Sequence, residues 1–371
     1  MPTSARPHRY AVVRRQPYSI PPANQIKPAA GGAFAAHRSV TYDAYICWQV
    51  DAFTDVPFRG NPAAVCLLEL DGAGARIRDV DRKWMLAVAA EFNAPVTAFL
   101  APAAAGGGTA ATPRFHIRWF TTVAEVELCG HATLAAAHFL LTGGGVGAGT
   151  GAIEFVTMAG LVLTARRRVK VVGKRACDDF AAHGVDRGGG GFCIELDFPV
   201  ASVEECGSGE LPALMPDTLN GASIVNVCKT STIGDLMVEL SSGEEIARLR
   251  PNFIEIRECA KRAMVVTGPA PAGSQVDFVT RLFAPNVGVD EDQVCGSVHC
   301  ALVPYWAKKL GKTRLTAQME NVRTLTLAFA VHVTMEPRLL QGAGRCAWSS
   351  TKMRSGCGSA EKLRPSWLAL C

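Results

Sequence analysis

The sequence predicts an α+β protein built from two similar lobes. The chain has 371 residues, which is enough for two domains with separate cores. Alternating apolar residues predict strands in both halves of the chain, and apolar runs with helical spacing follow some of them. One pattern of strand, loop, Cys-Gly pair and apolar helix occurs twice in the same order, which indicates an internal duplication. Its copies are Arg118-Trp119-Phe120 with Cys129-Gly130, and Arg281-Leu282-Phe283 with Cys295-Gly296.

The domain organisation follows from where this patterning begins and ends. The first part of the chain has scattered prolines and basic residues without a lasting period, so we expect a disordered or leader extension. The last part combines Ser, Arg and Cys with little period, so we expect an atypical, poorly ordered tail. The predicted parts are the extension 1–45, an N-terminal lobe 46–165, a loop-rich connection 166–192, a C-terminal lobe 193–335 and the tail 336–371.

The N-terminal lobe shows the clearest secondary-structure signals. Apolar spacing predicts a helix over 81–92, and Gly60-Asn61-Pro62 is typical of a turn. A second helix is expected from Cys129 to Leu141, and because it is apolar on all sides it should be buried inside the lobe. Strands are expected at 46–50, 63–68, 96–100, 115–119, 153–156 and 161–165.

The second half repeats this plan. Residues 277–283 are strand-like, and a loop through Pro285 and Gly288 leads to a mostly apolar helix start over 292–302. Pro304 should kink or end that helix, because proline lacks a backbone N–H and its ring clashes with the preceding turn.

Composition excludes several classes of protein. Hydrophobic residues make up 49% and charged residues 19%, which is typical of a globular protein. The net charge of +5 comes from the two ends of the chain, so no basic face for nucleic acid is expected. No apolar run is long enough to cross a membrane. The thirteen cysteines have no CxxC spacing, so no metal is expected, and no other cofactor is indicated. Without a secretion signal, the cysteines are expected to be reduced thiols in a cytoplasmic protein. Organelle targeting by residues 1–45 is the alternative.

The two Cys-Gly helix starts are the candidate reaction centre. A helix N-terminus offers free N–H groups and a partial positive charge, and glycine lets a carboxylate approach the backbone. The same field should lower the pKa of Cys129 and Cys295, so that two thiols could remove and return a proton on opposite faces of a substrate. His131 and Ser297 would lie in the first turns, and Asp292 just before the second helix.

Each of these residues also has an ordinary structural interpretation. A single His or Ser at a helix start is more often a cap or a core partner, and a single Cys in an apolar segment usually only packs. Two matched sets converging on one place favour a site.

Four stretches resemble the PhzF-like (phenazine biosynthesis-like) family and together cover roughly residues 47–318. They are VDAFTDVPFRGNPAAVCLLE, EFNAPVTAFL, IRWFTTVAEVELCGHATLAAAHFLL and DFVTRLFAPNVGVDEDQVCGSVHCALVPYW. The resemblance implies the diaminopimelate-epimerase fold, in which each lobe is a mostly antiparallel sheet wrapped around a central helix. It also implies an isomerase acting on a small carboxylate-bearing substrate, and a homodimer.

The resemblance also assigns site residues. The family's site His, Asp and Ser fall on His131, Asp292 and Ser297, and its backbone-donating glycines fall on Gly130 and Gly296. Asn61 is a further substrate-binding candidate in the turn before the second strand.

Two departures from the family pattern leave three functions open. Pro95-Val96-Thr97 replaces the family's Ser-Glu-Thr, whose Glu transfers the proton in the phenazine enzyme. Cys295 replaces the family's Thr and, opposite Cys129, gives a thiol pair similar to that of proline racemase and diaminopimelate epimerase. The chain is therefore interpreted as a PhzF-like isomerase acting by proton transfer. The alternatives are a two-cysteine racemase or epimerase, and an inactive member that binds a ligand or a protein.

Overall fold

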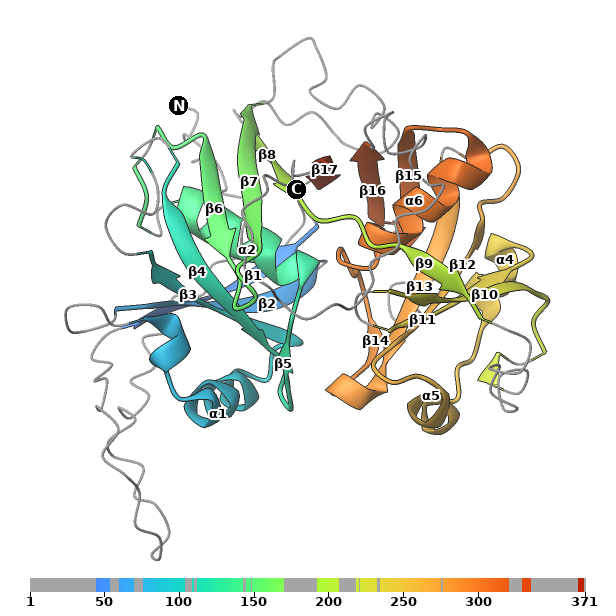
Figure 1. Cartoon of the computed structure of the whole chain (residues 1–371), viewed down its shortest axis with the longest axis horizontal. Helices are drawn as coiled ribbons and strands as arrows, with labels where there is room; N and C mark the ends of the chain where they lie inside the picture. The colour runs from blue at the N-terminus through green and yellow to red at the C-terminus, as the bar shows by residue number, and fades with distance from the viewer. Residues whose placement is uncertain are drawn as a thin grey trace, which may run out of the picture.

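The computed structural model shows two lobes side by side along the long axis of the molecule (Figure 1). It describes residues 45–53, 60–69, 76–103, 109, 112–142, 145–147, 149–169, 192–206, 218–219, 221–231, 234–274, 276–319, 329–334 and 366–369. Residues 1–44 of the predicted extension 1–45, and most of the predicted connection and tail, lie outside the described residues. Within the described part, no helix combines the length and apolarity needed to span a bilayer.

The N-terminal lobe is one curled, mostly antiparallel sheet. Its strands run in the spatial order β1-β2-β3-β4-β6-β7-β8, with parallel pairs only at β2–β3 and β4–β6, and β5 forms a hairpin with β4. The strands are β1 (Tyr45–Ala52), β2 (Asn61–Leu68), β3 (Val96–Pro102), β4 (Arg114–Phe120), β5 (Glu125–Val126), β6 (Ala152–Val156), β7 (Val162–Val169) and β8 (Phe192–Asp197).

The C-terminal lobe repeats this topology strand for strand. β10 to β17 pair with one another in the same order and directions as β1 to β8, so the predicted duplication is confirmed at the level of the sheet. β9 adds an edge to β10, and β17 pairs with β8 and joins the two sheets. The strands are β9 (Val203–Glu205), β10 (Ile224–Thr230), β11 (Leu236–Leu240), β12 (Met264–Pro269), β13 (Phe278–Ala284), β14 (Val289–Asp292), β15 (Arg314–Met319), β16 (Phe329–Thr334) and β17 (Ser366–Ala369).

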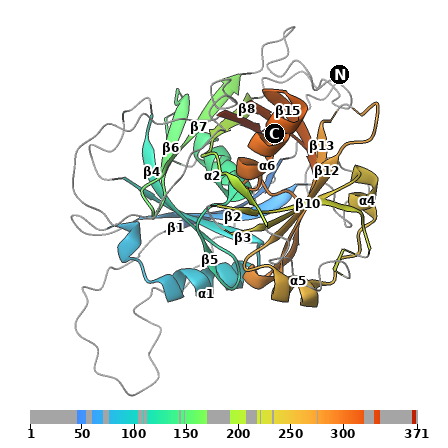
Figure 2. The same cartoon turned by 45° about the vertical axis from the view of Figure 1, so that its right-hand side comes forward.

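Each lobe encloses one helix and carries others outside. α2 (Gly130–Leu141) and α6 (His299–Leu310) lie within the curl of their sheets, whereas α1 (Arg82–Phe92) and α5 (Phe253–Cys259) lie on the outer side (Figures 1 and 2). The short α4 (Gly243–Arg248) and the 3-10 turns η2 (Ile77–Asp79) and η3 (Pro285–Val287) complete the described helices. α2 is buried along nearly its whole length, as its uniformly apolar sequence predicted.

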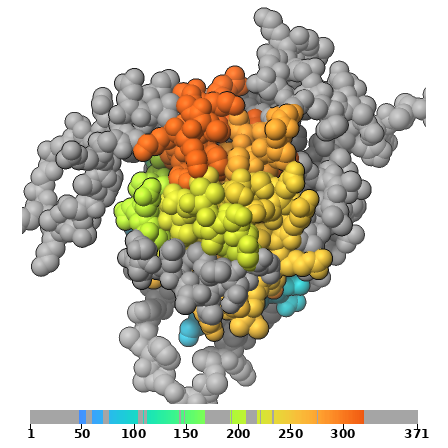
Figure 3. Space-filling model, turned by 90° about the vertical axis from the view of Figure 1, so that its right-hand side faces the viewer, coloured from blue at the N-terminus to red at the C-terminus, as the bar shows by residue number. Residues whose placement is uncertain are grey.

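Strand alternation produces these layers. In β3, Ala98 and Leu100 pack into the cluster around α2, while Phe99 and Ala101 pack against α1 on the opposite face. The inner cluster is continuous between the lobes, because residues of α2 and α6 belong to the same buried group. In the view of Figure 3, the C-terminal lobe covers this end of the molecule and hides almost all of the N-terminal lobe.

Two local predictions were wrong. Asn61 and Pro62 belong to β2, where they pair with β1, and do not form a turn. Pro304 neither ends α6 nor leaves a backbone group unsatisfied: the helix continues to Leu310, and the N–H of Ala201 donates to the carbonyl of Cys300 at 2.8 Å. Proline at position 304 has no N–H to donate to that carbonyl, so the N–H of Ala201 replaces the missing hydrogen bond of the helix.

The sheet also extends into two ranges that were expected to be irregular. β7 continues to Val169, and β17 is formed by Ser366–Ala369 near the end of the chain.

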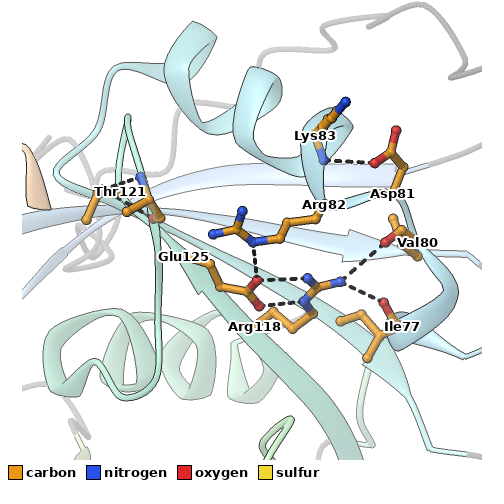
Figure 4. A network of polar contacts seen from close by, with 9 residues as sticks. Ile77, Val80, Asp81, Arg82, Lys83, Arg118, Thr121 and Glu125 are labelled. Atoms are coloured by element: carbon orange, nitrogen blue, oxygen red, sulfur yellow. Dashed lines mark hydrogen bonds and ion pairs between the residues drawn. The ribbon is translucent and has the colours of Figure 1, made fainter. Parts of the chain in front are cut away.

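A buried arginine occupies the same place in each lobe. Arg118 donates to the carbonyls of Ile77 and Val80 and is bound by both carboxylate oxygens of Glu125 (Figure 4). In the C-terminal lobe, Arg281 donates to the carbonyls of Ile246 and Leu249 and is bound by Glu291. The matching triplets in the sequence therefore mark equivalent positions.

Replacing Glu291 with glutamine should lower the free energy of unfolding by about 3 kcal/mol, because Arg281 is only 1% exposed and would lose its counter-charge. Asp290→Asn is the matched control. Its ion pair with Arg257 is exposed, so we expect a change within about 0.5 kcal/mol. Urea unfolding measures both variants, and equal losses would contradict the assigned role of Glu291.

Candidate functional site

The beginnings of the two enclosed helices touch. A Cβ atom added at Gly130 would lie 2.7 Å from the Gly296 Cα and 2.9 Å from the Ser297 backbone nitrogen, so the two chains meet backbone to backbone. Phe53 closes the contact beside Gly296. Only glycine on both sides permits this approach. The segments that lead into α2 and α6 therefore meet at one point, as the duplicated Cys-Gly pairs predicted.

The second helix start differs in detail from the prediction. α6 has α-helical geometry only from His299, and the residues before it form a tighter turn in which His299 N–H donates to the Gly296 carbonyl. Gly296 and Ser297 therefore lie in this introductory turn, whereas Gly130 already begins α2.

The two thiols occupy equivalent positions. Cys129 and Cys295 are 7% and 6% exposed, and each contacts the side chain two residues later in the chain. The Cys129 Sγ lies 3.4 Å from the His131 Nδ1, and the Cys295 Sγ lies 3.3 Å from the Ser297 Oγ. In both cases the N–H three residues later, of Ala132 or Val298, also acts on the sulfur and lowers its pKa.

The predicted lowering of the thiol pKa was wrong in sign. Burial raises the pKa of Cys129 well above its usual value and raises the pKa of Cys295 to about 12. The negative charge of Asp292 raises both pKa values further, and the helix N–H groups only partly offset this. Removal of both thiols from water therefore outweighs the helix field, and both are neutral at pH 7.

Asp292 is held across the lobe boundary. The Asn61 Nδ2 donates to the Asp292 Oδ1 at 2.6 Å and to the Val294 carbonyl at 2.9 Å, so both its N–H bonds are used. Asn61 is 1% exposed at the start of β2, and Asp292 ends β14 in the other lobe. Asn61 therefore fixes the position of the site carboxylate and ties the two halves together.

His131 is buried beside Cys129 and lies within the first turn of α2. It is 1% exposed, and its Nε2 has no hydrogen-bond partner within the described part of the chain. Burial lowers its pKa, which keeps the imidazole neutral at pH 7. A neutral imidazole can accept from the Cys129 thiol at Nδ1 and offer the other nitrogen to a ligand.

Comparison with known proteins identifies the family. The family model described as phenazine biosynthesis-like protein (PhzC-PhzF) matches residues 50–347. The chain belongs to this family. An uncharacterized isomerase of Halalkalibacterium halodurans is 36% identical over 74% of this chain and 86% of its own length. The human phenazine biosynthesis-like domain-containing protein is 32% identical over 72% of this chain and 85% of its own length.

Solved structures give the same result for the fold. A PhzF family protein of Enterococcus faecalis superposes with a TM-score of 0.60 at 25% identity, covering 88% of this chain and 95% of that one. A Pseudomonas aeruginosa protein described as a predicted epimerase has the same fold, with a TM-score of 0.53 at 19% identity over 87% of this chain and 95% of that one. The predicted α+β fold of diaminopimelate-epimerase type is therefore confirmed.

This PhzF-like chain has an apolar side chain at the family's Glu position. Val96 begins β3, is 5% exposed, and packs in the same buried cluster as Cys129 and Cys295. No carboxylate can therefore act from this position. Among the described residues of the candidate site, the two thiols, His131 and Asp292 are groups that can exchange a proton.

Two further residues of the PhzF-like site were not predicted. Arg262 precedes β12 without any motif around it, and its positive charge lowers the pKa of both site thiols. Met319, at the end of β15, accepts the backbone N–H of Cys295 at its sulfur, at 3.0 Å. In the sequence, the only feature that could have indicated Arg262 is the duplication, because Arg262 precedes β12, the strand equivalent to β3.

The stability of the PhzF-like fold should fall in acid because of His299. This side chain is fully buried, its Nδ1 lies 3.0 Å from the Cys295 carbonyl, and burial lowers its pKa to about 4. The unfolded chain takes up this proton near pH 6.5, whereas the folded chain does so only near pH 4. The contribution of neutral His299 to the free energy of unfolding is thus fully present above about pH 6.5. It is lost as the pH falls towards 4, by up to about 3 kcal/mol.

Urea unfolding at pH 7, 6 and 5 measures this loss. His299→Asn, which keeps an N–H donor near the Cys295 carbonyl, should show a shallower pH dependence than the unmodified chain. Burial also lowers the pKa of His138 to about 4. His138 is unchanged in both proteins, so its contribution to the acid sensitivity cancels in the comparison. Equal slopes would show that His299 does not titrate as described.

Proposed function

We propose that this PhzF-like chain is a cofactor-independent isomerase that moves a proton on a small carboxylate-bearing metabolite, with Cys129 and Cys295 as the proton-transferring pair. The observation that carries the proposal is the contact between Gly130 and Gly296, which brings two equivalent helix starts and their thiols to one place. Relatives that are named isomerases and cover most of the chain support the same reaction class.

The substrate carboxylate would bind at the paired helix starts. The backbone N–H groups and the positive ends of α2 and α6 favour an anion beside the point where Gly130 and Gly296 touch. The same N–H groups would stabilise the negative charge that spreads into the carboxylate when the neighbouring carbon loses its proton.

The two thiols complete the proton balance. One cysteine first loses its own proton to solvent. As thiolate, it then takes the proton from the carbon next to the carboxylate, and the C–H electron pair moves into the carboxylate. The other cysteine, as thiol, then gives its proton to the opposite face of that carbon and is left as thiolate. The substrate is inverted or its double bond is shifted, and the net protonation of the pair is unchanged.

The neighbouring polar groups would set which thiol holds the proton. Ser297 lowers the pKa of Cys295 through its hydrogen bond, and Asp292 opposes ionisation of both thiols. His131 offers a neutral nitrogen 3.4 Å from Cys129. Ser297 and His131 would thus orient and assist the two sulfurs, while Asp292 disfavours the thiolate form of both.

A second candidate is an inactive family member that only binds such a ligand. The buried Val96 favours it, because the family's proton-transferring carboxylate is missing. The two functions differ in whether a carbon-bound proton exchanges.

The test is incubation of the protein with small amino and hydroxy acids in deuterated water, followed by mass spectrometry. Label at the carbon beside the carboxylate in at least one acid supports the isomerase. Ligands that raise the melting temperature but never take up label would rule out the isomerase and leave the binding function.

A further inference from the structure

Arg262 lies next to the site at a position that the duplication defines. In the N-terminal lobe, Thr97 of β3 pairs with Ala64 of β2 and with Phe120 of β4. In the C-terminal lobe, Met264 of β12 pairs with Leu236 of β11 and with Phe283 of β13. The registers are equivalent, so Ala263 corresponds to Val96, the position where the family has its Glu.

The start of β12 therefore faces the meeting point from the second lobe as the start of β3 does from the first. Ala263 and Val96 are both buried in the cluster that contains Cys129 and Cys295. Arg262 precedes Ala263 directly, so the strand register places its positive charge on the C-terminal-lobe side of the meeting point. The charge of Arg262 accordingly lowers the pKa of both thiols.

A buried carboxylate orients this guanidinium. The Arg262 Nε donates to the Asp235 Oδ1 at 2.7 Å, and its Nη2 donates to the Asp235 Oδ2. Asp235 is 3% exposed, and the Thr230 hydroxyl accepts its backbone N–H. One edge of the arginine fork is therefore fixed, whereas Nη1 has no partner among the described residues and the side chain is 21% exposed.

The guanidinium of Arg262 is therefore arranged to bind an oxyanion in addition to its ion pair with Asp235. The edge formed by Nη1 and Nη2 matches the two oxygens of a carboxylate or phosphate. The other charge that acts on the thiols, Asp292, is a carboxylate already bound by Asn61 and cannot attract an anion. The helix starts can hold one anionic group, so Arg262 offers a place for another.

We infer that Arg262 binds a second anionic group of the substrate, so that the preferred substrates carry a carboxylate or phosphate in addition to the carboxylate at the helix starts. This inference rests on the proposed function for the location of the first carboxylate. It narrows the substrate class to small compounds with two acidic groups, and it makes Arg262 a specificity residue contributed by the second lobe.

Calorimetric titration at fixed ionic strength tests the inference. The probes are succinate, glutarate and adipate, the monocarboxylates of equal length, and 3-phosphonopropionate. The best diacid should bind about 10-fold to 100-fold more tightly than its monocarboxylate, from the added charged hydrogen bonds. Preference for the phosphonate over the diacids would identify phosphate as the second group.

The variants separate binding from folding. Arg262→Gln alone leaves Asp235 buried and unpaired, so Asp235→Asn with Arg262→Gln is the main variant, because it removes both charges. The double variant should bind mono- and diacids equally. Arg262→Lys, which keeps the positive charge, should retain part of the preference for diacids. Arg257→Gln, which removes an exposed arginine on α5, should keep the full preference.

Equal binding of mono- and diacids by the unmodified chain, or an unchanged preference in the double variant, would overturn the inference. Failure of the proposed function looks different. In that case the diacid preference depends on Arg262, but no ligand gains deuterium. If the proposed function holds and this inference fails, label enters monoacids and diacids alike, with and without Arg262.

Discussion

Replacement of Cys295 with alanine should reduce the turnover of an identified substrate by about 10²-fold to 10⁴-fold, the usual contribution of one acid–base group. Cys129→Ala should have a similar effect, because the two sulfurs act in turn on opposite faces of the same carbon. Both pKa values are raised by burial, so the assay is best made near pH 9, where more thiolate is present than at pH 7. Turnover is measured as inversion or isomerisation of the substrate.

Cys300 provides a matched control close to Cys295 in the chain. Its thiol is also buried and its pKa is also raised by burial, but it lies in α6, after the introductory turn that carries Gly296 and Ser297. Cys300→Ala should therefore retain nearly full turnover, with a loss of stability only. Full turnover in Cys295→Ala would remove the thiol pair from the mechanism and leave His131 and Asp292 as the remaining acid–base groups.

The variants also separate the two halves of the reaction. With Cys295 removed, Cys129 can still take a proton and return one to the same face. Deuterium uptake should then persist in one stereoisomer of the substrate while inversion is lost. Loss of both signals to the same degree in both isomers would indicate that one residue alone transfers the proton.

The sequence predicted those features that depend on local pattern. The uniformly apolar run after Cys129 required burial on all sides, and α2 is enclosed by its sheet. The repeated triplets at Arg118 and Arg281 predicted equivalent strands, and both arginines bind two carbonyls and one glutamate. Such features need only the periodicity and order of residues.

Features that depend on the other lobe were not predictable. The pKa of Cys295 is governed by burial between the lobes, which no neighbour in sequence reveals, so the helix effect alone gave the wrong sign. Asn61 and Asp292 are 231 residues apart, and their contact exists only after the lobes close. Pro304 was expected to kink or end its helix. The helix does not end there, because the N–H of Ala201, which is far from Pro304 in the chain, serves the Cys300 carbonyl.

Substitution of Gly130 with alanine should separate the two helix starts. Alanine is the better helix former, so propensity alone would stabilise α2 by up to about 1 kcal/mol. The added Cβ, however, would lie 2.7 Å from the Gly296 Cα and 2.9 Å from the Ser297 nitrogen, and these backbone atoms cannot rotate away. We expect a net loss of about 1–3 kcal/mol in the free energy of unfolding and a loss of detectable turnover, because the two helix starts no longer meet.

The glycines of this chain allow a graded test of that contact. A Cβ at Gly296 would approach the Gly130 Cα to 3.1 Å, a milder overlap, and a Cβ at Gly151 would meet no atom within 4 Å. The destabilisation should therefore decrease in the order Gly130→Ala, Gly296→Ala, Gly151→Ala, with the last within about 0.5 kcal/mol of the unmodified chain. Urea unfolding and deuterium uptake measure the series. If Gly130→Ala were as stable and as active as Gly151→Ala, the lobes would not meet at this point, and the proposed carboxylate position beside the contact would have to be abandoned.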